Sequence, residues 1–234
     1  MSSVIKSLPY ILTGFGTTVL VSLYVILVSI VIGIFVGIGR TSKNPFLKKC
    51  CKLFITVFRG IPSLVILYMV FFLPPEFGLE IASLPSAVIG LSFWGIANVG
   101  ELMRGAIESL PKQQFEAGES IGLKNAQVMI YVILPQAFRR ILPSLVGIIS
   151  NLVQNTTLAS FIGTTEFVKA CQYTIERIQL LENIPVSLIV YTILLIGYFA
   201  ICFPLAMLVK VFEKNAARNP GEKKRRKKIA AEVA

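Results

Sequence analysis

Few side chains in this sequence could perform acid–base or metal chemistry. All 12 acidic residues among the 234 are Glu, and the chain contains neither Asp nor His. Its cysteines, Cys50, Cys51, Cys171 and Cys202, include no C-x-x-C pair of the kind that binds zinc or cycles as a disulfide. We therefore expect no catalytic residue, no metal site and no cofactor on this chain.

One polar segment stands between two apolar runs: EAGESIGLKNAQVMIYVILPQAFRRILP, which begins at Glu116. Ala117 and Gly118 have almost no side chain, so another surface could approach them closely beside the Glu116 carboxylate. Gly122 can adopt a conformation that ends a helical turn. Pro135 disfavours an uninterrupted helix into the next apolar run. The segment is therefore either a docking surface or a hairpin that only joins two apolar helices.

A second polar cluster lies inside an apolar stretch. It consists of Asn151, Gln154, Asn155, Thr156 and Thr157. In a bilayer these groups lack water as a partner, so they should face another helix or a water-filled path. They could tie helices together, or they could line the path of a substrate whose ammonium and carboxylate groups need polar partners.

Asn98 and Glu101 form a third candidate, one turn apart on the same face of an apolar segment. An ionisable side chain within a membrane span is costly and usually faces protein or a water-filled cavity. Arg104 follows Glu101 at i+3, so the carboxylate could instead form an ordinary ion pair on the helix surface near the cytoplasmic boundary. The sequence leaves both interpretations open.

The elements that must position these side chains are membrane helices. Hydrophobic residues make up 55% of the chain and charged residues 15%, whereas a soluble domain usually carries about 25% charged residues. The mean hydropathy is +0.75, and about 20 apolar residues cross a bilayer as a helix. We predict one all-α integral membrane domain over 1–234, with spans at roughly 10–39, 53–73, 84–103, 141–162 and 185–209. Arg59 could instead mark membrane entry after an interfacial helix that begins at Pro45.

Basic loops orient these spans. The net charge is +11, and the loop between the first two spans carries five basic residues and no acid. The tail 210–234 has nine basic residues and three Glu, whereas the loops on the opposite side carry net charges of −2 and −1. The positive-inside rule then predicts an outer amino terminus, with the loop 104–140 and the tail 210–234 in the cytoplasm. Because this rule explains the basic charge, we expect no nucleic-acid partner.

The polar segment resembles the EAA signature of ABC importer permeases. That signature reads E-A-A, three residues, G, nine residues, I, one residue and L-P. The matching residues here are Glu116, Ala117, Gly118, Gly122, Val132, Leu134 and Pro135. Gly118 replaces an alanine and Val132 an isoleucine. In that family the segment forms a coupling helix that docks on a separate ATPase subunit, and the resemblance implies the same role here.

Three further segments resemble the polar amino-acid branch of this family: FRGIPSLVILYMVFF, GELMRGAIESLPKQQFEAG and NTTLASFIG. Ile61 stands where the R-G-T-P segment of that branch has threonine. Asn155 stands where its D-T-S-L-A-S segment has aspartate, and Gln154 precedes it where lysine is common. In the family this last segment lines the subunit interface and can contact the amino acid. The lost charge at position 155 leaves a preference for cationic substrates without support.

The resemblance implies the membrane subunit of an ATP-driven importer for polar amino acids, working by alternating access in the bacterial cytoplasmic membrane. The implied partners are cytoplasmic ABC ATPase subunits, an extracytoplasmic amino-acid-binding protein and a second permease subunit, either a copy or a paralogue. The chain lacks the G-x-x-x-x-G-K-[ST] loop that cradles nucleotide phosphates, so ATP and Mg should bind the partner. Two alternatives are an ion-coupled secondary amino-acid carrier or channel, and a structural scaffold.

Overall fold

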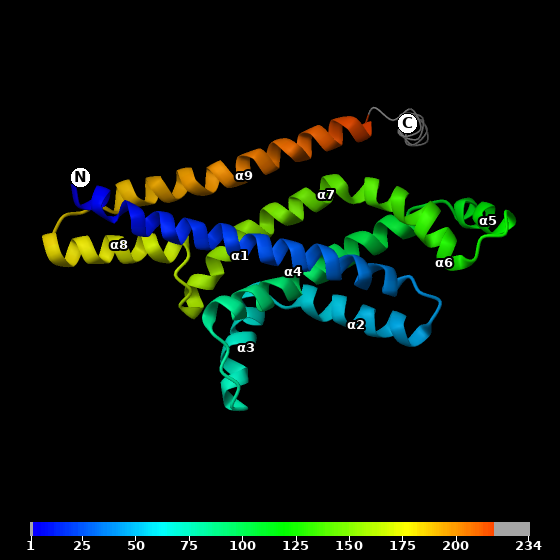
Figure 1. The fold of residues 1–234 in the computed structure, drawn as a ribbon, viewed down its shortest axis with the longest axis horizontal. Helices are drawn as coiled ribbons and strands as arrows, with labels where there is room; N and C mark the ends of the chain where they lie inside the picture. The colour runs from blue at the N-terminus through cyan, green and yellow to red at the C-terminus, as the bar shows by residue number, and fades with distance from the viewer. Residues whose placement is uncertain (1, 218–234) are drawn as a thin grey trace, which may run out of the picture.

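A computed structural model describes residues 2–217, and every regular element among them is helical (Figure 1). The tail predicted over 210–234 therefore lies largely outside the described residues. In chain order the elements are α1 (Ser2–Arg40), α2 (Pro45–Gly60), α3 (Ser63–Glu76), α4 (Ser83–Glu108), α5 (Lys112–Ser120), α6 (Asn125–Gln127), a π-helical turn η1 (Val128–Ile133), α7 (Leu134–Asn155), a 3-10 turn η2 (Thr156–Ile162), α8 (Phe167–Glu182) and α9 (Ser187–Ala217).

Four stretches of helix are long and apolar enough to cross a membrane. They are Ser3–Arg40, Ser83–Glu108, Asn125–Ile162 and Ser187–Val211, and the bent pair α2–α3 makes a fifth if it is counted as one span. The all-α membrane class predicted from composition is confirmed, and these helices suit a protein that crosses the membrane several times.

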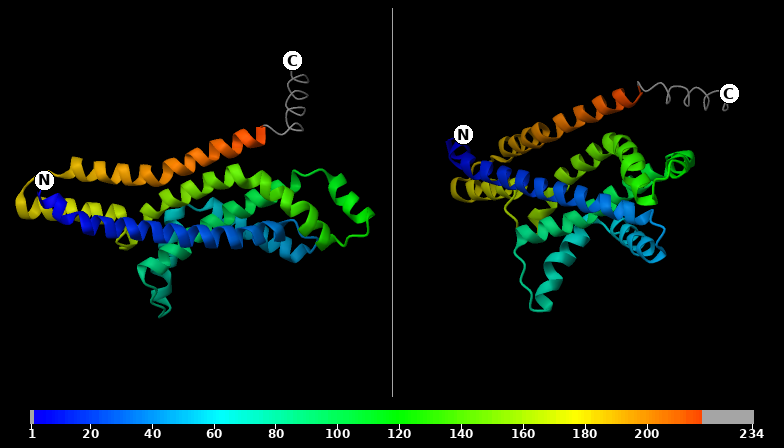
Figure 2. Two further views of the ribbon diagram at one scale, coloured as in Figure 1. Left: turned by 45° about the horizontal axis from the view of Figure 1, so that its top comes forward. Right: turned by 45° about the vertical axis from the view of Figure 1, so that its right-hand side comes forward.

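The second span was expected either over roughly 53–73 or as a membrane entry near Arg59 after a helix from Pro45, and the structure has a separate helix that begins at Pro45. The chain bends by 104° between α2 and α3. The residue before a proline is biased away from helical geometry, and Ile61, before Pro62, has an extended backbone (φ −95°, ψ 134°). Beyond this break α3 projects sideways from the other helices, so we call it the α3 arm (Figures 1 and 2).

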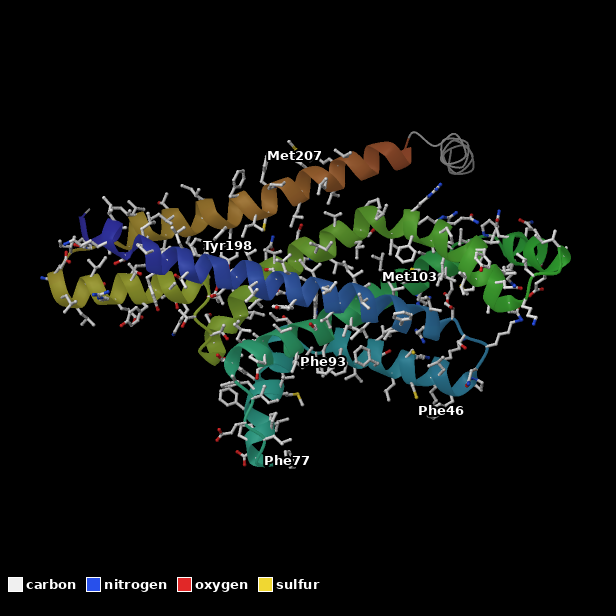
Figure 3. All side chains as sticks on the ribbon, viewed as in Figure 1. Phe46, Phe77, Phe93, Met103, Tyr198 and Met207 are labelled. Carbon is white, nitrogen blue, oxygen red and sulfur yellow. The ribbon has the colours of Figure 1, made fainter. Side chains whose placement is uncertain are left out.

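The α3 arm is buried only at its base. Ile66 and Leu67 are fully enclosed, and Leu67 lies against Gly90 of α4. Farther out, apolar side chains such as Phe72 and Phe77 are exposed, and Phe77 marks the far end of the projection (Figure 3). The arm thus offers a broad apolar surface that the described part of this chain does not cover.

Small residues let α1 pack closely along α4. A Cβ added at Gly33 would lie 2.7 Å from the Cβ of Val99, and one at Gly37 would lie 2.6 Å from the carbonyl oxygen of Gly100. Met103, on the same side of α4, is fully buried (Figure 3). This contact fixes the rotation of α4 and turns Asn98 and Glu101 away from α1.

The fourth span also begins differently from the prediction, in which Pro135 separated it from the polar segment. Pro135 lies in the first turn of α7, where its missing N–H is tolerated. The preceding residues Val128–Ile133 form a π-helical turn rather than a break. The helical path therefore continues from Asn125 to Ile162.

A helix absent from the prediction, α8, fills the segment between the last two spans. Glu166 caps its amino terminus by accepting hydrogen bonds from the amides of Val168 (3.0 Å) and Lys169 (2.8 Å). The same carboxylate also accepts from the hydroxyls of Thr18 on α1 and Tyr198 on α9, both at 3.3 Å. Glu166 is fully buried and joins three helices.

The polar connections gather at the two ends of the helices. The α1–α2 connection and the α5–α6 region lie at one end, and the amino terminus and α8 lie at the other (Figures 1 and 2). The basic loop therefore shares its end with the EAA segment, as the predicted topology requires. Which end faces the cytoplasm stays a prediction from the charges.

Candidate functional site

The EAA segment forms a compact turn between two short helices. After α5 the amide of Gly122 donates to the carbonyl of Glu119 (2.9 Å), and the amide of Leu123 donates to the carbonyl of Gly118 (3.2 Å). This pair of hydrogen bonds is a Schellman motif. The motif requires a left-handed residue, and Gly122 supplies it with φ +86°. The predicted role of Gly122 in ending the turn is therefore seen in the backbone.

The segment presents one face outward and packs the other against the bundle. Glu116, Ala117 and Ile121 are exposed, and Ile121 is 76% exposed despite its apolar side chain. Phe115 and Leu123 are partly buried against the core formed by α4, η1 and α7. The outward face is thus a small, nearly flat surface with one carboxylate and one apolar side chain.

Gly118 does not belong to that outward face, contrary to the expectation that it lies beside Ala117 on a surface open to another protein. It is buried, and a Cβ placed there would lie 2.8 Å from Cγ2 of Val128. Its missing side chain lets η1 approach α5. Leu134 is likewise packed against the core, whereas Pro135 is exposed.

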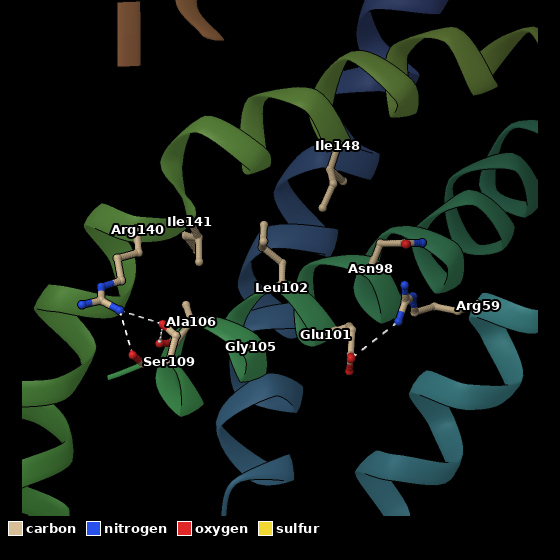
Figure 4. A pocket seen from close by; sticks show the side chains of 10 residues that line it. All are labelled: Arg59, Asn98, Glu101, Leu102, Gly105, Ala106, Ser109, Arg140, Ile141 and Ile148. Carbon is tan, nitrogen blue, oxygen red and sulfur yellow. Dashed lines mark hydrogen bonds and ion pairs between the residues drawn. The ribbon is translucent and has the colours of Figure 1, made fainter. Parts of the chain in front are cut away.

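A cavity of about 470 Å³ opens between α2, α4 and α7, on the side where the EAA segment lies. Its polar lining residues are Arg59, Asn98, Glu101, Ser109 and Arg140 (Figure 4). Leu102, Ala106, Ile141 and Ile148 form apolar walls. Asn98 and Ser109 are 11 residues apart, so the cavity extends about 16 Å along the axis of α4.

Within the cavity wall, Glu101 is held by Arg104. Arg104 donates from Nε (2.9 Å) and Nη2 (2.6 Å) to the two carboxylate oxygens, and its Nη1 also contacts Glu108. Arg59 Nη1 lies 3.7 Å from Glu101 Oε1, an ion-pair distance beyond hydrogen-bond range (Figure 4). The predicted Glu101–Arg104 pair is thus present, and Glu101 faces the cavity as well.

The second cationic group of the cavity, Arg140, closes its end nearest the EAA segment. Its Nη1 donates to the carbonyl oxygen (3.0 Å) and the hydroxyl oxygen (2.8 Å) of Ser109 (Figure 4). These bonds connect the end of α4 to the beginning of α7.

The polar cluster of the fourth span lies outside this cavity and divides in two. Asn151 and Gln154 are exposed and Asn155 is partly exposed; no hydrogen bond joins these amides to another side chain of residues 2–217. Thr156 is fully buried, and its hydroxyl donates to the carbonyl of Val153 (2.7 Å). The expectation that Thr156 faces a path is therefore not met, because its own helix satisfies it.

Asn151 nonetheless lies close to the cavity. It follows Ile148 by three residues on α7, so the two side chains share one face of the helix. Asn151 therefore continues the cavity face by about one turn toward the opposite end of the bundle.

Arg59, Arg140 and Ser109 line the cavity, and sequence reasoning assigned none of them to a site. Arg59 carried a signal: it is a lone cation just before the Ile61–Pro62 break inside an apolar stretch. Arg140 and Ser109 carried none, since they are brought together by the packing of α4 on α7. No group of three or more Cys or Glu side chains with metal-binding geometry occurs within residues 2–217.

Residues 29–218 match the family described as binding-protein-dependent transport system inner membrane component. The chain belongs to this family. It is 35% identical over 213 residues to the probable amino-acid ABC transporter permease YckA of Bacillus subtilis (strain 168), covering 91% of this chain and 92% of that protein. It is 31% identical over 210 residues to the L-cystine transport system permease TcyB of the same organism, covering 90% and 88%.

Comparison with solved structures supports the same family assignment for this permease. An amino acid ABC transporter with histidines superposes with a TM-score of 0.79 at 26% identity, covering 91% of this chain and 97% of that chain. The inward-facing MetNI methionine transporter superposes with a TM-score of 0.67 at 20% identity, covering 88% and 97%, and shares the fold. The resemblance to ABC importer permeases drawn from the motifs is therefore confirmed, and the alternative of a secondary carrier is not favoured. The permease is a transporter subunit.

Proposed function

We propose that this permease forms half of the translocation pathway of an ATP-driven amino-acid importer in a bacterial cytoplasmic membrane. ABC ATPase subunits on separate chains bind ATP and Mg and dock on the outward face of the EAA segment. The observation that carries the proposal is the geometry of that face. Its Schellman turn holds Glu116, Ala117 and Ile121 exposed on a rigid support.

The rigid support matters for how force would be transmitted. The EAA segment is packed on the core through Phe115 and Leu123, and Arg140 fastens α7 to the end of α4. A displacement of α5 by closing ATPases is therefore passed to α4 and α7, which border the cavity. Alternating access follows if this displacement opens the cavity toward one side of the membrane and closes it toward the other.

Two further partners complete the proposal. A second permease subunit, a copy or a paralogue, covers apolar surface that residues 2–217 leave open, including the α3 arm and the exposed Phe72 and Phe77. An extracytoplasmic binding protein delivers the amino acid at the end that carries α8. The relatives named as amino-acid and L-cystine permeases support an amino acid as substrate.

The coupling role is tested by Gly122→Val. Position 122 has φ +86°, but no heavy atom of another part of residues 2–217 lies within 4 Å of the place where a Cβ would be. Valine there therefore strains the backbone without a steric clash against these residues, at a cost of about 1–3 kcal/mol locally. We expect substrate-stimulated ATP hydrolysis to be lost while membrane insertion and permease dimerisation persist. Gly147→Val is the matched control, because Gly147 also has open space but no positive φ. Stimulated hydrolysis at the wild-type rate in an assembled Gly122→Val complex would argue against this coupling surface.

A further inference from the structure

The cavity between α2, α4 and α7 holds one cation that the described part of the protein does not fully use. Glu101 accepts two hydrogen bonds from Arg104, and Arg140 donates two to Ser109. Arg59 lies only within ion-pair distance of Glu101 and donates no hydrogen bond to any residue in 2–217. Its side chain is 45% exposed, against 24% for Glu101.

Cavity chemistry around Arg59 suits a carboxylate. A guanidinium presents parallel N–H donors that match the two oxygens of a carboxylate. Arg59 lies in the last turn of α2, just before the 104° bend, and its guanidinium points toward α4 beside Asn98 and Glu101 (Figure 4). Glu101, fixed by Arg104, orients Arg59 without occupying its donors.

Asn98 supplies a complementary acceptor. Its Nδ2 donates to the carbonyl of Trp94 (2.8 Å), which leaves Oδ1 available to accept from an ammonium group. A guanidinium and an amide oxygen side by side can match the two charged groups of a zwitterion.

The remaining walls indicate what kind of side chain would fit. Leu102, Ala106, Ile141 and Ile148 are apolar, and the acidic residue of the described lining, Glu101, is already paired with Arg104. The volume of about 470 Å³ lies within the range of about 300–1,000 Å³ typical of small-molecule sites. A cationic side chain would find no free carboxylate in this lining, whereas a neutral one could lie against the apolar walls.

We propose that this cavity is a substrate site within the permease, in which Arg59 binds the α-carboxylate and Asn98 the ammonium of an amino acid with an uncharged side chain. Glu101 acts as a positioning residue through its contact with Arg59. The inference rests on the proposed amino-acid transport and adds the site, the carboxylate-binding residue and the substrate class.

The experiment first screens the 20 proteinogenic L-amino acids and L-cystine for uptake by proteoliposomes that contain the complete transporter and its binding protein. The best amino acid, radiolabelled, is then bound to the detergent-solubilised permease–ATPase complex without the binding protein, so that only a site on the transporter is measured. We expect saturable binding to wild type, competition by the unlabelled amino acid, and little competition by its α-carboxamide.

Single substitutions then test the role proposed for Arg59. Arg59→Gln should weaken binding by about tenfold to a hundredfold, because a hydrogen-bonded charge pair is lost, and Arg59→Lys should restore part of it. Arg139→Gln should change the affinity less than twofold, since Arg139 is exposed on α7 and is not among the residues that line the cavity. Basal ATP hydrolysis and co-purification of the ATPase report correct assembly of every variant.

Several outcomes would overturn the proposal while leaving amino-acid transport intact. They are uptake without any binding to the complex alone, equal competition by the α-carboxamide, a best substrate with a cationic side chain, and wild-type affinity in an assembled Arg59→Gln complex. Loss of affinity together with loss of assembly in both Arg59 variants would also contradict it, because Arg59 would then be a structural residue. Absence of uptake for every amino acid in the panel would refute the proposed transport function itself.

Discussion

Glu166 is a buried carboxyl at the point where α1, α8 and α9 meet. Burial raises its pKa, and the hydrogen bonds from the Val168 and Lys169 amides and from the Tyr198 and Thr18 hydroxyls oppose that rise without cancelling it. A carboxyl whose pKa is raised by folding binds its proton more tightly in the folded protein. Its contribution to stability is therefore present below the unfolded pKa of about 4.3 and is lost as pH rises through the folded value.

The direction of the Glu166 pKa shift predicts how Glu166→Gln changes the pH dependence of stability. Glutamine keeps an oxygen for the α8 amides but does not titrate. We expect the melting temperature of the variant to fall less than that of wild type as pH rises from about 4.5 to about 7.5. Thermal unfolding of the purified permease in detergent, followed by circular dichroism, measures the difference. Glu176→Gln removes an exposed carboxylate from the same helix and should keep the wild-type pH dependence. Identical pH profiles for wild type and Glu166→Gln would refute the prediction.

The exposed amides of α7 allow a second prediction at this scale. Asn151 shares a helix face with Ile148 of the cavity wall and has no side-chain partner within residues 2–217. Asn151→Leu keeps the size but removes both hydrogen-bonding functions, so we expect slower uptake with assembly and basal ATP hydrolysis preserved. Thr156→Val, at the buried threonine, should lower stability by about 1 kcal/mol without changing uptake kinetics. Normal uptake by Asn151→Leu would indicate that this amide does not border the path.

At the scale of the elements, α5 and η1 pack closely against each other at Gly118. Gly118→Ala places a methyl group 2.8 Å from Cγ2 of Val128, and this overpacking should cost about 1–3 kcal/mol. We expect weaker co-purification of the ATPase and a lower melting temperature. Val128→Ala in the same chain removes the obstructing methyl groups and should restore ATPase binding. If the double variant binds the ATPase no better than Gly118→Ala alone, Gly118 acts through the partner surface and not through η1.

Hydropathy predicted the elements whose side chains are apolar over a long run, which are α1, α4 and α9. The break of the second span was encoded in Ile61–Pro62, but hydropathy averages over it. Helix α8 was not predicted because its exposed face is polar and the segment is short enough to be a loop.

The EAA turn was predictable because Gly122 is a local signal, whereas the burial of Gly118 depends on Val128 in another element. The cavity was not predictable, since Arg59, Glu101 and Arg140 line one cavity only when three helices pack.

For the whole molecule, the gathering of basic loops at one end predicts the orientation. In a background with the native cysteines replaced, a cysteine at Lys48 should resist an impermeant thiol reagent in intact cells, and one at Glu176 should react. Both positions are exposed in the structure, so protection reports the side of the membrane rather than burial. Permeabilised cells provide the control, in which both positions should react. The opposite labelling pattern would invert the topology and remove the EAA segment from the ATPase side.

The bend at Ile61 also has a consequence for biogenesis. Helix α2 has 16 residues and the α3 arm 14, so as straight helices they measure about 24 Å and about 21 Å, both shorter than a hydrocarbon layer of about 30 Å. Neither half can leave the translocon as a stable span by itself. The base of the arm is buried against α4, which is synthesised later. We therefore expect this region to settle in the bilayer only after α4 has emerged, with α2, α3 and α4 inserting together.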